Sequence, residues 1–392
     1  MFLKTFVVLP LLFASLNTPS NSSCVVKTHK TTTVCKNKQK KTVSTTTTLP
    51  TISDQVNVHT NIFYRLNQNV LERRSSSGYY FSNDSRSQSS FHPIRVKAYN
   101  QIKSLNKSSG HSNVQFIWDI RPEFPIDIQS YLVYRTKNAA EVFNNIFTNK
   151  IYVNTLLATE KDVDYSPVTT SYFTDTYYQL QRFQSTNFNN QLAWITGGGG
   201  YWNSQAKLFF GTPTTAVTER YVSNWIQIPA HEFFHIVQHY LFNGRINEGR
   251  SNFNVVVPHH FREGSAVFIG YSVDTPNLGW YSDAMDQRFS LIWSNNNTLS
   301  VPKTQDDIIN LLLFTENSAD QFAFDLAYPL GAFFWEWFVA TYGYEQFISL
   351  IKDMPNHSSF DNTIKSNYGI SKVDLYRLSS AYMLEAINKI IN

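Results

Sequence analysis

The chain is poor in cysteine, and the two that it has lie close to its start. Cys24 and Cys35 are the only cysteines among 392 residues. In an oxidising compartment they could pair and close a small loop. The rest of the chain therefore has no disulfide framework, and it has no thiolate that could bind a metal or attack a substrate.

Apolar runs of membrane length are absent. Phe6–Leu16 is an apolar run too short to span a bilayer, and Lys4 precedes it while small polar residues follow. We expect residues 1–23 to be a signal peptide, with an uncleaved N-terminal anchor as the alternative. We expect the mature protein to be secreted or associated with the cell envelope, without a transmembrane span.

Most of the chain has no excess of basic residues. The net charge is +4, but seven lysines precede residue 42 and leave a formal charge of −3 on the remainder. This balance argues against a nucleic-acid partner. The basic, Thr-rich residues 24–60 cannot bury enough apolar area to fold, so we expect a disordered stalk. The stalk either contacts an anionic envelope polymer or membrane surface, or it is a solvated tether.

Internal repeats are also absent, which argues against a solenoid or a propeller. Apolar spacing predicts strands at 113–120, 151–159 and 207–211, and it predicts that GGGGYW (197–202) is a flexible turn. The second half of the chain has helical spacing almost throughout. The expected helices are 62–73, 93–105, 130–145, 171–184, 222–243, 255–272, 278–293, 304–315, 319–342, 344–353 and 372–390.

This order of elements predicts an α+β fold, with a small mixed sheet carrying helices in the first half and a helical second half. Residues 151–392 are expected to form the catalytic domain. Residues 61–150 form an N-terminal region of unknown role, which is a propiece, a binding lobe or part of the core.

The segment PAHEFFHIVQHY carries the clearest chemical signal. On a helix, His231 and His235 lie one turn apart on the same face, so two imidazoles can bind one ion. Zinc suits this pair because it takes neutral imidazole nitrogens and leaves a position for water. Glu232 then lies beside that water and can accept its proton as a general base. The alternative is a helix whose histidines make ordinary hydrogen bonds.

A third ligand is needed. Gln238 and Leu241 stand where an extended HExxHxxGxxH motif would have Gly and His, so that route is closed. Glu263 follows the second motif histidine by 28 positions, inside an apolar helix where a lone carboxylate would be unfavourable unless bound. It would complete a His₂Glu catalytic site. His259 and His260 are rival ligands. The small residues after the glutamate are expected to let its helix pack closely against the metal helix.

AHEFFHIVQHY followed by FREGSAVFIG resembles the gluzincins, in particular the peptidase-MA-like branch related to the M1 aminopeptidases and thermolysin. The resemblance implies zinc ligands at His231, His235 and Glu263, a catalytic base at Glu232, and a zincin-like fold with a small sheet before the metal helix. It covers roughly residues 150–390 and is strong only at the two motifs. The long spacing to the glutamate and the missing GxMEN motif depart from the family pattern, so aminopeptidase specificity is not implied.

Three further features have weaker signals. Tyr328 lies where related enzymes often place a phenol that stabilises an oxyanion, and a buried core tyrosine is the alternative. His239 either orients the site or faces solvent. KLFFG (207–211) is either an edge strand that pairs with an extended peptide or an ordinary core strand.

The sequence therefore predicts a secreted, zinc-dependent metallopeptidase that acts on a peptide or protein substrate. One alternative is an inactive metal-binding or envelope-interaction module of the same fold. The other is a zinc hydrolase that acts on a different kind of bond.

Overall fold

The computed structural model describes residues 86–105, 113–166, 180–181, 196–202, 205–214, 226–242, 256–294, 300–316 and 320–391. All of them belong to the unit formed by residues 50–392. The expected signal peptide, stalk and 62–73 helix, and nearly all of the 171–184 helix, lie outside these residues. None of the described helices is long and apolar enough to cross a membrane.

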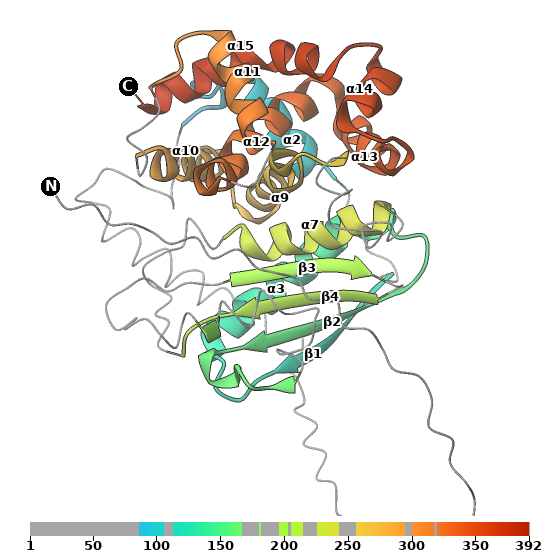
Figure 1. Cartoon of the computed structure of the whole chain (residues 1–392). Coiled ribbons are helices and arrows are strands. Elements are labelled where there is room, and N and C mark those ends of the chain that lie inside the picture. Colours follow the sequence, from blue (N-terminus) through green and yellow to red (C-terminus); the bar gives the residue numbers. More distant parts are fainter. Residues whose placement is uncertain are drawn as a thin grey trace, which may run out of the picture. The chain divides into compact units, whose positions relative to one another are not determined.

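The sheet has four strands in the order β1-β2-β4-β3. Strands β1, β2 and β4 are parallel, and β3 runs antiparallel to β4 at one edge (Figure 1). Helix α3 connects β1 to β2, as a parallel pair requires. The strands are β1 (Val114–Ile120), β2 (Ile151–Ala158), β3 (Thr196–Trp202) and β4 (Gln205–Gly211).

The topology of this sheet corrects one sequence prediction and decides between the two alternatives left open for another segment. GGGGYW is strand β3 and not a flexible turn, because each of its residues pairs with a residue of β4. Segment 207–211 lies in β4, between β2 and β3. It is the core strand of the two alternatives, and the edge position belongs to the glycine-rich strand.

Helices make up most of the second half, as expected. Helix α14 was not predicted: Ser359 caps its first turn, and Gly369 ends it at a φ of 70°. The helices are α2 (Pro93–Lys103), α3 (Ile126–Phe143), α7 (Ile228–Leu241), α9 (His259–Asp274), α10 (Leu278–Ser294), α11 (Gln305–Phe314), α12 (Gln321–Tyr342), α13 (Tyr344–Asp353), α14 (Phe360–Tyr368) and α15 (Lys372–Ile391), with short 3₁₀ turns at Gln88–Ser90, Asn144–Ile146, Glu160–Asp162 and Met354–Asn356.

Helix α7 lies between the sheet and the other helices (Figure 1). It packs on β3 and α3 on one side and on α9 on the other, and α9 in turn packs on α12. Helix α2 packs on α12, and β1 pairs with β2. The described part of residues 61–150 thus belongs to the same core as the residues that follow, and the α+β class is confirmed.

Helices α9 and α12 cross at two glycines. A Cβ atom on Gly264 would lie 2.4 Å from the backbone of Gly331, and one on Gly331 would lie 2.0 Å from the carbonyl oxygen of His260. The small residues expected to face the metal helix therefore face two different helices. Gly264 faces α12, whereas Ser265 faces α7, where it accepts a hydrogen bond from Gln238. This close crossing sets the distance between α12 and the turn of α9 that carries Glu263.

Candidate metal centre

The two histidines of the HExxH motif lie side by side on α7. Their Nε2 atoms are 3.1 Å apart, and both side chains are buried. The helix begins with Pro229 in its first turn, where no backbone N–H is needed. Asp274, at the end of α9, accepts a hydrogen bond from the amide of Ala230 at 3.2 Å. The helix that presents the histidines is thus held at its N-terminus by the neighbouring helix.

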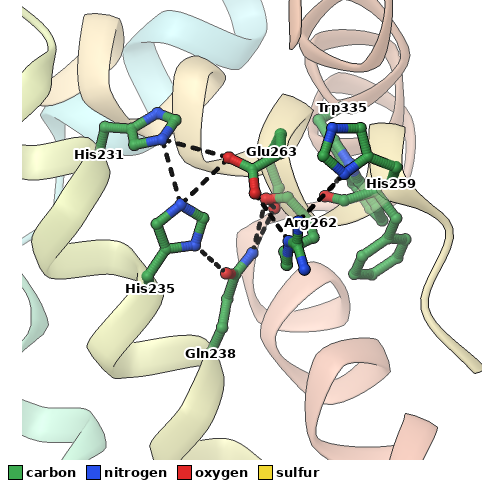
Figure 2. Close-up of polar contacts among 9 residues, drawn as sticks. His231, His235, Gln238, His259, Arg262, Glu263 and Trp335 are labelled. Atoms are coloured by element: carbon green, nitrogen blue, oxygen red, sulfur yellow. Dashed lines mark hydrogen bonds and ion pairs between the residues drawn. The ribbon is translucent and has the colours of Figure 1, made fainter. Parts of the chain in front are cut away.

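Glu263 faces both histidines from α9 (Figure 2). Its Oε2 atom lies 3.5 Å from Nε2 of His231 and 3.3 Å from Nε2 of His235. Its other oxygen accepts a hydrogen bond from Nε of Arg262 at 2.7 Å. One carboxylate oxygen is therefore held by an arginine, and the other is directed at the two imidazoles.

These three donor atoms fit a zinc ion. Bonds of about 2.0–2.1 Å in a tetrahedral site place ligand atoms about 3.3 Å apart, which matches all three separations. Among the described residues, His231, His235 and Glu263 are the only group of three ligand side chains this close together. Two nitrogens and one carboxylate oxygen leave a fourth position open, as catalytic zinc sites do.

The electrostatics of the three residues favour a cation between them. Burial lowers the pKa of His231 to about 4, so its ring is neutral and able to bind a metal. Burial opposes charge on His235 as well, but the Glu263 carboxylate holds the pKa of that ring above its usual value. Burial likewise opposes charge on Glu263, but His235 and Arg262 hold its pKa well below the usual value. The buried carboxylate thus keeps its negative charge beside the two imidazoles.

The rival ligands point elsewhere. The Nδ1 atom of His259 lies 3.1 Å from an N–H group of Arg262 (Figure 2). The ring of His259 stacks on that of Phe324. His260 is fully buried on another side of α9, with Nε2 3.1 Å from the hydroxyl of Tyr376. Neither histidine belongs to the three-residue group.

Gln238 is a site residue that the sequence did not reveal. Its Oε1 atom lies 2.7 Å from Nδ1 of His235, an arrangement that assigns the proton to Nδ1 and leaves Nε2 free for a metal. Its amide nitrogen donates to the carbonyl of Arg262 and to the hydroxyl of Ser265. One side chain therefore orients a ligand and joins the two ligand-bearing helices. The only sequence signal was its position three residues after His235, on the same helix face.

We predict that Gln238→Leu weakens zinc binding by about 10- to 100-fold, because the orienting hydrogen bond and the link between the helices are both lost. The measurement is competition for zinc against a chromophoric chelator. Gln321→Leu, at an exposed position of α12, is the matched control and should leave the affinity unchanged. Equal affinities in the wild type and Gln238→Leu would exclude this role.

Glu232 lies beneath the glycines of β3. It is buried, and its carboxylate accepts a backbone hydrogen bond from Gly199. Cβ atoms on Gly197 and Gly199 would lie 2.5 Å from the Glu232 side chain and 1.9 Å from its carbonyl oxygen, respectively. Only a strand without side chains on this face can approach the motif so closely. Burial raises the pKa of Glu232 to about 7, which suits a group that accepts and returns a proton near neutral pH.

The alternation of side chains along β3 provides an internal control. Gly199→Ala should destabilise the fold by about 1–3 kcal/mol, since the added methyl group forces β3 away from α7. Gly198→Ala should change the stability by less than about 1 kcal/mol, because no atom lies within 4 Å of its Cβ position. Denaturant unfolding of the two variants checks the difference, and equal losses would contradict this packing.

Tyr328 and His239 are both placed by the structure. The ring of Tyr328 is half-buried and lies parallel to that of His231, with centroids 6.1 Å apart and 6° between the planes. Burial raises the pKa of its hydroxyl well above the usual value, so the phenol keeps its proton. His239 does not face solvent. It is buried, and its Nδ1 accepts a hydrogen bond from the amide of Tyr201 in β3 at 3.2 Å.

Comparisons with protein-family models, with curated proteins and with solved structures gave no significant match to this chain.

Proposed function

We propose that the protein is an exported zinc-dependent hydrolase with a zincin-like fold, and specifically a metallopeptidase of the gluzincin type. The observation that carries this proposal is the convergence of three donor atoms, 3.1–3.5 Å apart, on a helix pair that also holds the buried Glu232. The apolar run near the start of the chain supports export.

His231, His235 and Glu263 would hold the zinc ion. When bound there, zinc supplies Lewis-acid chemistry, polarising a carbonyl group and making water more acidic. Glu232 accepts a proton from the attacking water and returns it to the leaving amine. Tyr328, which stays protonated, donates a hydrogen bond to the carbonyl oxygen as negative charge develops on it.

A peptide substrate is favoured by strand β3. It is the last strand in the sheet order, and its backbone lies directly against Glu232. An extended peptide that lies alongside this strand, beyond the N–H groups of Gly199 and Tyr201 that already donate to α7, would bring a backbone carbonyl next to the catalytic group. The substrate-contacting role considered in the sequence for segment 207–211 is thus proposed for β3.

The test is hydrolysis of a mixed peptide library by the full-length protein after export. We expect cleavage that is lost when a chelator removes the metal and that returns after about one equivalent of zinc is added back. Zinc binding without cleavage of any peptide would favour the inactive metal-binding module. Cleavage that survives complete removal of the metal would contradict the proposal.

A further inference from the structure

The ring of Tyr328 lies between the side chain of Arg288 and the proposed metal ligand His231. Its guanidinium carbon is 5.3 Å from the centre of the Tyr328 ring, and this ring stacks on that of His231. The arginine comes from α10, and the other two residues come from α12 and α7. Three helices that are separate in the sequence thus bring a cation to the edge of the metal centre.

This cation has no counter-charge in the described part of the chain. Arg288 forms no ion pair there, and its buried Nε atom has no hydrogen-bond partner among the described residues. Tyr271 lies next to the guanidinium, and its buried hydroxyl likewise has no partner of normal hydrogen-bond geometry. Arg288 as a whole is only partly buried, so part of its side chain is open to a ligand.

Three carboxylates of the neighbouring helices are bound by other arginines. On α10 itself, Asp283 binds Arg86 at 2.9 Å and Asp286 binds Arg95 at 2.7 Å. At the metal centre, Glu263 binds Arg262 at 2.7 Å. A partly buried arginine without a carboxylate is unfavourable unless a ligand supplies the missing charge.

We propose that Arg288 binds a carboxylate of the substrate close to the bond that is cleaved. The inference rests on the proposed function and adds the class of substrate to it. A guanidinium is planar and binds carboxylates through two parallel hydrogen bonds, which fixes the orientation as well as the charge of the bound group. The carboxylate is either the free C-terminus of a peptide or the side chain of an Asp or Glu residue. The first makes the enzyme a carboxypeptidase, and the second gives it an acidic side-chain preference.

The experiment measures peptide binding without turnover, in the zinc-loaded Glu232→Gln protein. Four versions of one peptide separate the sources of charge: a free C-terminus, a C-terminal amide, and amides that carry either an internal Glu or a Gln at the same position. We expect one carboxylate-bearing peptide to bind about 10- to 100-fold more tightly than its neutral counterpart in calorimetry. Arg288→Gln, added to the same background, should reduce this preference to less than about 2-fold.

Two controls keep the outcomes separate. Arg377→Gln removes an exposed arginine on α15 and should preserve the preference, and Arg288→Gln must keep its zinc content and melting temperature. Equal binding of all four peptides, or no binding of any, overturns the inference, and so does a preference that survives Arg288→Gln. If the preference depends on Arg288 but the wild type cleaves nothing, the carboxylate site stands and the peptidase proposal fails.

Discussion

Glu232→Gln is expected to lower kcat/KM for peptide hydrolysis by about 10²- to 10⁴-fold while the zinc stays bound. The amide keeps the shape of the side chain and its contacts beneath β3, but it cannot accept a proton from water. None of the three donor atoms of the metal centre belongs to this residue. The measurements are steady-state hydrolysis of a cleaved peptide and the zinc content of the same samples.

Glu345→Gln is the matched control for this substitution, because the side chain of Glu345 is exposed on α13. It should retain full activity. The stability of Glu232→Gln should equal or exceed that of the wild type, since burial disfavours the charged form of Glu232 and the amide carries no charge. Full activity in Glu232→Gln would show that another group activates water, and the catalytic assignment would be wrong.

Arg95→Met is expected to produce the largest loss of stability, about 3–5 kcal/mol in the free energy of unfolding. Arg95 comes from α2 and is buried. Its Nε donates to Glu336 of α12 at 3.0 Å, and its NH1 donates to Asp286 and Ser282 of α10 at 2.7 and 2.8 Å. Glu336 is fully buried and also accepts hydrogen bonds from Tyr281 and Tyr382. The substitution leaves a buried carboxylate without its cation.

The charges around Arg95 support the expectation that Arg95→Met causes the largest loss of stability. Burial opposes the charge of Arg95, yet the carboxylates of Asp286 and Glu336 hold its pKa well above the usual value. Arg377→Met is the matched control: its ion pair with Asp374 is about half exposed on both sides, so its loss should leave the stability almost unchanged. The double variant Arg95→Met with Glu336→Met should lose less than the sum of the single losses, because both partners leave together. Denaturant unfolding of Arg95→Met, Glu336→Met, the double variant and Arg377→Met measures these losses. A loss below about 1 kcal/mol for Arg95→Met would contradict a central role for this network.

The three candidate metal ligands could be predicted from local spacing, but the residues that support them could not. His231 and His235 follow from helix geometry, and Glu263 follows from the unfavourable energy of a lone carboxylate in an apolar helix. Gln238 has only its position on the helix face of His235 as a signal, and Arg262 has none, because their hydrogen bonds depend on how α7 and α9 face each other. The lack of a counter-charge for Arg288 among the described residues depends on how α7, α10 and α12 pack and on which acids other arginines bind.

The glycine run shows why part of the fold was misjudged. Four consecutive glycines favour a turn locally, and nothing in their own sequence indicates a strand. The strand forms because β4 offers a complete ladder of partners and because α7 approaches so closely that side chains at Gly197 and Gly199 would collide with Glu232. The α+β class was predictable because it depends on the order of apolar patterns, whereas this edge depends on contacts between distant segments.

The central claim is that His231, His235 and Glu263 hold one zinc ion. It is tested most directly by elemental analysis of the purified full-length protein and of its His235→Ala and Glu263→Ala variants. We predict about one zinc per chain in the parent protein and almost none in either variant, with all three folded. Zinc retained without Glu263 would contradict the assignment of the third ligand. No zinc in the parent protein, even after zinc is supplied, would contradict the metal centre itself.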